Sequence, residues 1–380
     1  MNYGLYIHFP FCVHKCFYCD FYSLENLNLI DKFVDSLLKE IDIISSDFTQ
    51  KPVIDTIFFG GGTPSLINPL NIEKIFYKIN NNFNLSNDIE ITLECNPGTI
   101  DVKYFSDYKK FGINRISFGV QSFIVEELKF LERIHSVEEI HKAFDIARNV
   151  GFDNINLDLI FSLPNQPLNN WKYNLEQAIA LEPNHISAYS LIYEENTPLY
   201  SHYKKGKVKK NSSDQDVEFY DLTTELLNNA NFEQYEVSNY AKNNLYCKHN
   251  LKYWNSEEYF AFGPSAVGIL QNLRYKNHSS LSKYNKLIKN SQRPIEFTEE
   301  LTKDIRIFER IFLTLRARGL NIKQFSEEFN INLLKKGEKI IEQFIKNGFM
   351  LIKDNTLKLT PKGYFVGDDI TLKLMDAIEQ

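Results

Sequence analysis

The chain of 380 residues has only five cysteines, no long apolar run and no excess of basic residues, and each shortage excludes a class of protein. Its formal net charge of −6 argues against nucleic acid as the main partner, because nucleic-acid-binding proteins carry a basic face. No apolar run approaches the roughly 18 residues that span a bilayer, so we do not expect an integral membrane protein. The chain opens Met-Asn-Tyr-Gly without the basic segment of an export signal, so we expect a cytoplasmic protein.

Three of the five cysteines are crowded into one short segment near the start of the chain. Cys12, Cys16 and Cys19 have the spacing CxxxCxxC, which lets one loop place three thiolates around a single metal centre. No other cysteine lies close enough in sequence to complete a four-thiolate set. Iron–sulfur clusters take thiolate ligands, and an open coordination position admits a substrate. The spacing therefore predicts a metal centre with one position left open.

A disulfide and a zinc site are the two other interpretations of these cysteines. A disulfide requires an oxidising compartment, for which no export signal is present. Structural zinc with His8 or His14 as the fourth ligand remains an alternative, although zinc sites usually have a second ligand pair further along the chain. Cys95 and Cys247 are isolated in the sequence, and we expect them to be small buried side chains.

Short apolar or β-branched runs alternate with longer amphipathic stretches, which is typical of successive parallel βα units. The predicted strands are 5–8, 53–59, 89–93, 115–118, 154–159 and 185–191, and the predicted helices are 29–45, 71–80, 102–110, 124–131, 137–150 and 168–180. Right-handed crossovers would curl these units into an open barrel. The predicted fold class is therefore α/β, a partial (β/α)6 barrel of the TIM type.

Polar residues follow the end of each predicted strand. They are the cysteine loop, residues 60–65, residues 94–98, Gln121 with Ser122, Asp158, and Tyr189 with Ser190. The carboxyl ends of the strands form the rim at which βα barrels carry their chemistry. The sequence therefore predicts one site at this rim, with six loops contributing to it.

Each rim residue also has a simpler interpretation. The glycines of residues 60–62 either form a tight turn or let a ligand reach main-chain N–H groups at a helix N-terminus. Glu94 and Asp158 either satisfy local polar groups or face a cationic or hydroxylated ligand. Arg133 lies in a polar break between two helical stretches, where solvation is the default.

The pattern changes after about residue 200, and we predict three domains. Residues 1–200 form the barrel with the metal site, residues 201–295 an α/β extension, and residues 296–380 a C-terminal helical domain that resembles a winged helix. The last region shows no basic recognition face, so we expect a cover or docking domain.

The extension contains the segment HNLKYW at residues 249–254. His249 is a candidate axial ligand for a haem iron, and Tyr253 and Trp254 offer flat stacking surfaces. The alternative is a polar turn that Asn239 and His249 pin against the barrel.

Taken together, these motifs resemble those of the radical S-adenosylmethionine enzymes in the oxygen-independent coproporphyrinogen oxidase group. The matching segments are residues 6–19, 60–64, 94–97, 117–122 and 156–160. Residues 235–240, 249–254 and 315–320 also resemble segments of the haem chaperone branch of this group. The resemblance thus spans nearly the whole chain.

The resemblance implies a four-iron, four-sulfur cluster on Cys12, Cys16 and Cys19, with S-adenosylmethionine on the fourth iron. In the family, an electron from the cluster cleaves this molecule to a 5′-deoxyadenosyl radical. By position, Tyr6, Gly61 and Glu94 match contacts to the cluster-bound molecule. Tyr18, Gly62, Thr63, Gln121, Arg133 and Asp158 match positions that hold a second molecule in the oxidase. No catalytic residue is assigned, and whether the protein is an enzyme stays open.

Departures from the oxidase pattern favour the haem chaperone branch. Phe21 stands where the oxidase has a fourth cysteine, and eleven residues precede Cys12 where the oxidase has a long extension. We therefore expect haem transfer to haem-requiring proteins, membrane respiratory enzymes among them, rather than oxidative decarboxylation of coproporphyrinogen, which is the alternative. Family members commonly have histidine where Val267 stands, so His249 is the remaining candidate haem ligand. An electron donor and a homodimer are further expected partners.

Overall fold

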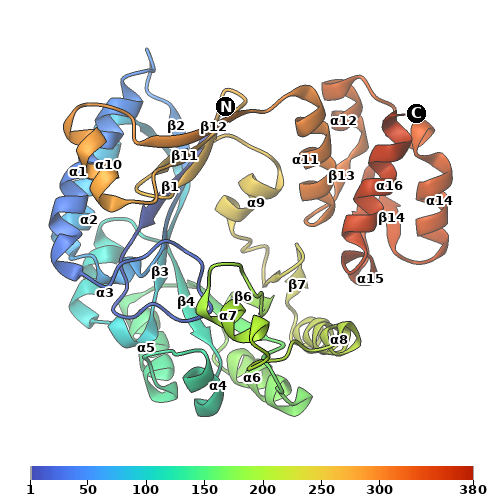
Figure 1. Cartoon of the computed structure of the whole chain (residues 1–380), viewed down its shortest axis with the longest axis horizontal. Helices are drawn as coiled ribbons and strands as arrows, with labels where there is room; N and C mark the ends of the chain where they lie inside the picture. The colour runs from blue at the N-terminus through green and yellow to red at the C-terminus, as the bar shows by residue number, and fades with distance from the viewer. Residues whose placement is uncertain (1, 380) are drawn as a thin grey trace.

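The computed structural model describes residues 2–379, and its central feature is an open twelve-stranded sheet (Figure 1). Six strands in chain order form its parallel centre: β1 (Asn2–Phe9), β2 (Val53–Gly61), β3 (Asn84–Cys95), β4 (Arg115–Gln121), β5 (Asn154–Phe161) and β6 (His185–Ser190). The two edges of the sheet are different strands, β12 and β7, so the sheet does not close on itself. The predicted α/β fold with an open parallel sheet is confirmed.

Later segments extend both edges of this sheet. β9 (Tyr259–Phe262) pairs with β1 in parallel, and β10 (Val267–Leu270), β11 (Leu273–Asn277) and β12 (Ile295–Glu300) follow in antiparallel order. At the other edge, β6 pairs with β8 (Asn239–Ala241), and β8 with β7 (Glu233–Gln234). The sequence missed β9 to β12. Between β7 and β8, residues 235–238 form an irregular turn.

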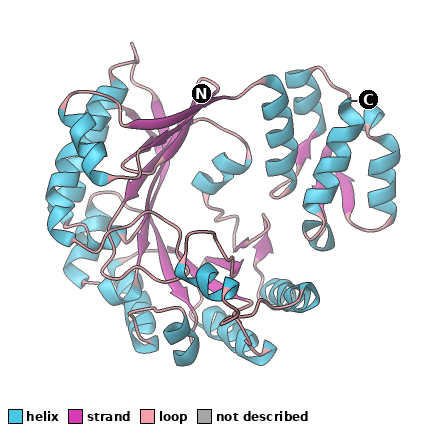
Figure 2. Ribbon diagram, in the orientation of Figure 1, coloured by secondary structure: helices cyan, strands magenta, loops and turns pink. Residues whose placement is uncertain are grey.

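Helices cover the outer face of the parallel strands, as Figure 2 shows. They are α1 (Ile30–Ser45), α2 (Pro69–Asn82), α3 (Val102–Lys110), α4 (Val125–Phe130), α5 (Val137–Val150) and α6 (Leu168–Ala180). Their ends follow local capping signals: Asp101 accepts from the Tyr104 N–H group, and Ser136 and Glu139 form a capping box. The predicted helices therefore match closely.

Alternation along the strands separates an apolar outer face from a polar inner face. On β5, Ile155, Leu157 and Leu159 are buried in the main hydrophobic core under the helices. Asn156 and Asp158 point to the opposite face, because successive strand residues alternate. The inner face is covered by α9 (Lys248–Trp254), which packs against β2. This arrangement leaves polar side chains inside the curve of the sheet.

The remaining helices lie after the parallel strands. α7 (Pro198–Lys204), α8 (Ser213–Asn229) and α10 (Leu281–Lys289) join the main body. The C-terminal part comprises α11 (Lys303–Leu315), α12 (Ile322–Phe329), α13 (Leu333–Lys336), α14 (Glu338–Lys346), α15 (Pro361–Tyr364), α16 (Gly367–Glu379), and a sheet of β13 (Leu320–Asn321), β15 (Thr356–Leu359) and β14 (Met350–Lys353).

The C-terminal part has its own hydrophobic cluster, which includes Ile311, Phe325 and Leu374. It contacts the main body where the Val237 N–H group donates to the Arg316 carbonyl at 2.8 Å. The domain boundaries at residues 200 and 295 stay predictions. Within residues 2–379, none of the helices combines the length and apolarity that crossing a bilayer requires.

Candidate functional site

The cysteines lie on a loop, residues 10–24, that follows the carboxyl end of β1. Main-chain hydrogen bonds close its base, from Cys12 N to Leu24 O at 3.0 Å and from Leu24 N to Pro10 O at 2.9 Å. Phe11 anchors the loop, because its buried ring packs against Phe9 and Phe33 in the core. The loop is thus fixed at its ends while its cysteines stand over the rim of the sheet.

Each of the three sulfur atoms has a hydrogen-bond donor directed at it. Thr63 Oγ1 donates to Cys12 Sγ at 3.5 Å, and Arg133 Nη1 donates to Cys16 Sγ at 3.6 Å. Burial raises the pKa of Cys19 to about 11, and a hydrogen bond from the Phe21 main chain acts in the opposite direction. Such donors strengthen when the sulfur becomes an anion. The three donors therefore suit thiolate ligands, whereas the burial of Cys19 acts against ionisation of its thiol.

The two histidines named for a zinc site are both engaged elsewhere. His8 Nδ1 lies 3.1 Å from Tyr6 Oη, and His8 Nε2 lies 2.8 Å from the Tyr22 carbonyl. His14 faces Glu25 and Glu132 at 3.3 and 3.4 Å. Across residues 2–379, no three His, Cys, Asp or Glu side chains converge closely enough for one metal ion. The ligands of a polynuclear cluster bind different irons and need not converge on one point.

The glycine segment serves the fold in a way that the sequence analysis did not anticipate. Gly62 N donates to Phe9 O at 2.8 Å, and Thr63 N donates to Phe11 O at 2.7 Å. A Cβ atom on Gly62 would lie 2.4 Å from the Phe11 carbonyl oxygen, so only glycine fits. These N–H groups therefore have partners within the protein, which favours the tight turn over direct contact of these N–H groups with a ligand. The glycines instead let the cysteine loop dock on the end of β2.

Two carboxyl groups lie near one another below this segment. Glu94 Oε2 accepts from Gly61 N at 3.1 Å. Burial, and then the nearby Asp158, raise the pKa of Glu94 to about 8. Burial also raises the pKa of Asp158, and hydrogen bonds from Ser187, Asn156 and Ser117 oppose it. A cationic ligand would relieve the repulsion between these two groups.

Arg133 joins the cysteine loop to β4, so its predicted solvation is wrong. Its Nη2 donates to Gly119 O at 2.7 Å, and its Nε, which is buried, has no hydrogen-bond partner. Burial raises the pKa of Tyr18, which lies on the cysteine loop, and the charge of Arg133 and a hydrogen bond from its side chain act in the opposite direction. Gln121 ends β4 with a positive φ of 68°, an uncommon backbone region for a residue other than glycine. Arg133 and Tyr18 therefore lie beside Cys16, and the Gln121 side chain lies with that of Arg133 next to Gly119.

A cavity of about 400 Å³ opens beside the cysteine loop. Its lining combines residues of β1, the end of the cysteine loop, α9 and the strands that follow: Tyr6, His8, Asp20, Phe21, Tyr22, Tyr253, Tyr259, Ser265, Val267 and Lys276. Phe21, which stands in place of the fourth cysteine, is 59% exposed at its edge. The size and the aromatic walls suit an organic ligand with a flat ring.

His249 lies deeper than the cavity and has no exposed surface. Its Nδ1 lies 2.8 Å from Thr56 Oγ1 and its Nε2 lies 2.7 Å from Tyr253 Oη, so both nitrogens are engaged. Burial lowers its pKa to about 3, which keeps the ring neutral. A metal can bind His249 only after one of these hydrogen bonds breaks.

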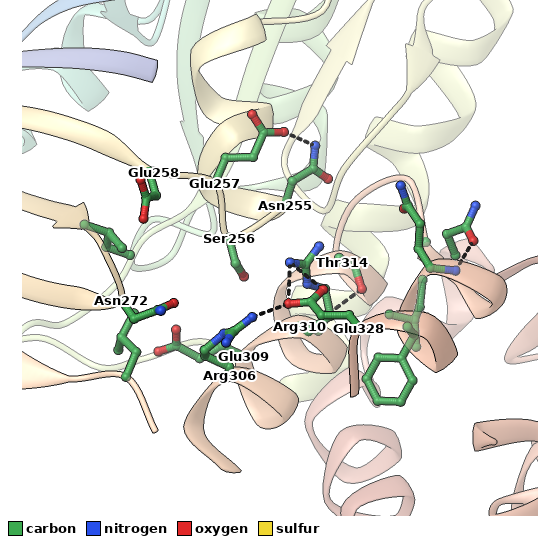
Figure 3. Close-up of a pocket in the computed structure, with 17 residues that line it drawn as sticks. Asn255, Ser256, Glu257, Glu258, Asn272, Arg306, Glu309, Arg310, Thr314 and Glu328 are labelled. Atoms are coloured by element: carbon green, nitrogen blue, oxygen red, sulfur yellow. Dashed lines mark hydrogen bonds and ion pairs between the residues drawn. The ribbon is translucent and has the colours of Figure 1, made fainter. Parts of the chain in front are cut away.

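A second cavity, of about 430 Å³, lies between the main body and the C-terminal part (Figure 3). Arg306 and Arg310 of α11 both face Glu328 of α12 there, at 2.5 and 3.1 Å. None of the residues predicted for the site lines this cavity. Its charged side chains pair with one another, which is typical of a junction between two structural units.

A set of polar residues that was not predicted from the sequence lies on the inner face of the sheet. Arg115, Ser117, Asn156, His185 and Ser187 are all buried there. The signal was present, because polar residues alternate with apolar ones along β4 and β5. Because both faces of these strands are buried, the alternation does not separate an exposed face from a buried one, and the polar residues could not be recognised as the lining of a site.

An open α/β sheet with three loop cysteines at its carboxyl rim defines a protein of the radical S-adenosylmethionine class. The family model described as "Radical SAM superfamily" matches residues 6–177, and the model described as "HemN C-terminal domain" matches residues 301–366. The structure of "Coproporphyrinogen III oxidase (HemN) from Escherichia coli" superposes with a TM-score of 0.84, covering 98% of this chain and 90% of that one at 21% identity. At that identity the likeness shows the fold alone.

Curated relatives narrow the class to one family. "Heme chaperone HemW" of Bacillus subtilis (strain 168) is 34% identical over 96% of this chain and 97% of the relative. The protein of the same name from Buchnera aphidicola subsp. Schizaphis graminum is 35% identical over 95% of both chains. The one from Escherichia coli (strain K12) is 40% identical over 70% of this chain and 69% of the relative. The chain belongs to the HemW family of the radical SAM superfamily.

Proposed function

We propose that this protein is a haem chaperone that binds a [4Fe–4S] cluster, S-adenosylmethionine and haem, and delivers haem to haem-requiring proteins. The observation that carries the proposal is the match to relatives named heme chaperone over almost the full length of both chains. The replacement of the oxidase's fourth cysteine by the exposed Phe21 supports the same choice.

The cluster is assigned to Cys12, Cys16 and Cys19, whose sulfur atoms each face a donor. When bound, such a cluster supplies an electron and one open iron position. Tyr6, Gly61 and Glu94 are assigned to the S-adenosylmethionine at this position, and Tyr18, Gly62, Thr63, Gln121, Arg133 and Asp158 to a second molecule. The paired carboxyl groups of Glu94 and Asp158 support a ligand that carries ammonium and sulfonium charges.

For haem, His249 remains the proposed iron ligand, with a condition that follows from its contacts. Iron has to replace either Thr56 or Tyr253 on the imidazole. Thr56 is buried on β2, whereas Tyr253 lines the cavity beside the cysteine loop. We propose that Tyr253 swings away and exposes Nε2 when haem binds.

The alternative is a radical S-adenosylmethionine oxidoreductase that decarboxylates coproporphyrinogen. The set of residues that match both S-adenosylmethionine positions favours it. Its test is conversion of coproporphyrinogen by the reduced, cluster-loaded protein with formation of 5′-deoxyadenosine. Cleavage of S-adenosylmethionine without substrate conversion would not support it.

Anaerobic reconstitution followed by haem titration tests the chaperone proposal directly. We expect a Soret band that saturates at a fixed ratio of haem to protein, and transfer of that haem to an apo-acceptor such as a membrane respiratory enzyme. A cluster-loaded protein that binds no haem would overturn the proposal. A cytoplasmic location, an electron donor and a homodimer complete the proposed setting.

A further inference from the structure

A chain of hydrogen bonds crosses the inner face of the sheet and ends at Asp158. It starts at the main-chain N–H group of Cys247, which donates to Tyr235 Oη at 3.2 Å. Tyr235 Oη lies 2.8 Å from His185 Nε2, and His185 Nδ1 lies 2.6 Å from Asn156 Oδ1. Asn156 Nδ2 then donates to Asp158 Oδ1 at 2.8 Å. His185 is completely buried and Tyr235 is 3% exposed, so water cannot replace these partners.

The two ends of this series of hydrogen bonds together fix their directions. The Asp158 carboxylate can only accept, so the Asn156 Nδ2 group donates to it and Asn156 Oδ1 faces His185 Nδ1. At the other end the Cys247 N–H group can only donate to the Tyr235 oxygen, which leaves the tyrosine proton free to point at His185 Nε2. Burial lowers the pKa of His185 well below its ordinary value, which keeps the ring neutral. A neutral imidazole that accepts at Nε2 carries its proton on Nδ1. His185 therefore donates to Asn156.

The donor on His185 supports one orientation of the Asn156 amide. With Oδ1 on His185, the Nδ2 group donates to Asp158 and also to Ser117 Oγ at 2.7 Å. Ser117 Oγ in turn donates to Asp158 Oδ2 at 3.0 Å. A flipped amide would place its oxygen against the carboxylate and withdraw that donor. Asn156 Oδ1 also accepts from Ser187 Oγ at 3.2 Å, but a hydroxyl can accept as well as donate, whereas the protonated Nδ1 of His185 can only donate.

We infer that His185 and Tyr235 are positioning residues that hold the Asp158 carboxylate in the orientation its ligand requires. The inference rests on the proposed function, because Asp158 is assigned there to S-adenosylmethionine. Neither residue is among those assigned to the ligand; both act through Asn156. The expected consequence of breaking the chain is weaker binding of S-adenosylmethionine with an intact cluster.

Two substitutions of His185 separate its hydrogen bond from its bulk. His185→Leu removes the donor, whereas His185→Asn keeps an N–H group near the place of Nδ1. Calorimetry on the cluster-loaded protein measures the dissociation constant for S-adenosylmethionine, and paramagnetic resonance reports the cluster. We expect roughly tenfold weaker binding for His185→Leu, in the range that outer partners of a ligand site show, and near-native binding for His185→Asn.

Tyr235→Phe is a second test of the same inference, because it removes the hydroxyl that contacts His185 and keeps the aromatic ring. It should weaken binding in the native background and add nothing in the His185→Asn background, where the link to Tyr235 is already lost. Tyr284→Phe is the matched control. This substitution also removes one buried tyrosine hydroxyl, which donates to Glu40 at 2.6 Å and takes no part in the hydrogen bonds that lead to Asp158. It should leave the affinity for S-adenosylmethionine unchanged.

The outcomes separate this inference from the proposed function. Native affinity in a folded, cluster-loaded His185→Leu protein would overturn the inference and leave the proposed function standing. Failure of the native protein to bind S-adenosylmethionine would overturn both. If His185→Leu does not fold, the Tyr235→Phe pair decides, because an equal effect in both backgrounds contradicts a route through His185.

Discussion

The two ends of the inner face of the sheet carry similar residues and use them differently. At the floor, which we define as Glu90, Cys247 and His249, acceptors and donors are matched: Glu90 accepts from the N–H groups of Lys248 and His249, both at 3.1 Å. At the mouth, which comprises the cysteine loop with Glu94, Arg133 and Asp158, two acids lie near one another and burial raises the pKa of both. An unpaired guanidinium Nε does not distinguish the two ends, because Arg115 and Arg133 both have a buried Nε without a hydrogen-bond partner.

The difference separates groups that hold the fold from groups that await a ligand. A buried charge with a full set of partners contributes to folding and gains nothing from a further contact. A buried charge beside a like charge gains from a contact with an opposite charge.

The largest effect is expected at the mouth, from Cys16→Ser. A neutral hydroxyl is a poor replacement for a soft thiolate, so the cluster should be lost while the fold remains. Iron and sulfide analysis after anaerobic reconstitution measures the loss. Cys95→Ser is the control, because Cys95 is equally buried but lies outside the loop, and it should retain its iron. Full iron content in Cys16→Ser would contradict the assignment.

At the floor, Glu90→Ala should cost about 3 kcal/mol of unfolding free energy, because it leaves buried N–H groups of α9 without an acceptor. Denaturant unfolding of the ligand-free protein measures the change. Asp88→Ala is the control on the same strand: Asp88 pairs with Lys248 at 3.1 Å, but its side chain is 82% exposed, so the loss of stability should be far smaller than for Glu90→Ala. Equal costs would remove the contrast.

Substitutions at His249 and Tyr253 test whether His249, which belongs to the floor, can bind haem iron. His249→Ala should weaken haem binding, and Tyr253→Phe should strengthen it, because it frees Nε2 from its partner at 2.7 Å. Soret titrations of the two variants against the native protein measure both changes. Weaker binding in Tyr253→Phe would instead point to the tyrosine as the iron ligand, which some haem proteins use.

A pH dependence should arise from the mouth. Glu94 has a pKa of about 8 in the folded protein, above the value of about 4.3 for a free glutamate. Its contribution to stability is therefore complete below about pH 4 and is lost as the pH rises through about 8. Thermal midpoints of the ligand-free protein should fall between pH 5 and pH 9, and less steeply in Glu94→Gln. Parallel curves for the two proteins would contradict this.

The smallest effect is expected outside both ends, in the cavity at the C-terminal junction. Arg306→Ala removes a partly exposed partner of Glu328, which keeps Arg310 as a second partner. The unfolding free energy should change by less than about 1 kcal/mol. S-adenosylmethionine binding should not change, and calorimetry on the loaded variant checks it.

The fold was predictable where local signals and burial agree. The bounds of α3 and α5 follow from capping residues and apolar spacing, those of α6 from apolar spacing without a capping side chain, and all three match the prediction. β9 was missed because it pairs with β1, far away in sequence, and β10 to β12 were missed with it because they continue the sheet from β9. Strand pairing of this kind leaves little local signal.

The site was predictable in its residues and less so in its contacts. The sequence placed Glu94, Asp158 and the glycines at one rim, and the structure brings them together there. It could not show that the glycine N–H groups bind the cysteine loop, because that contact joins two chain segments. The partners of His249 were hidden for the same reason, since Thr56 is distant in sequence.

The closed base of the cysteine loop bears on what a cysteine substitution can disturb. Because Pro10, Cys12 and Leu24 are joined through their own peptide groups, the two ends of the loop are held together by contacts that involve no sulfur atom. Exchange of a single thiol should therefore alter the ligand set and leave the path of the main chain in place.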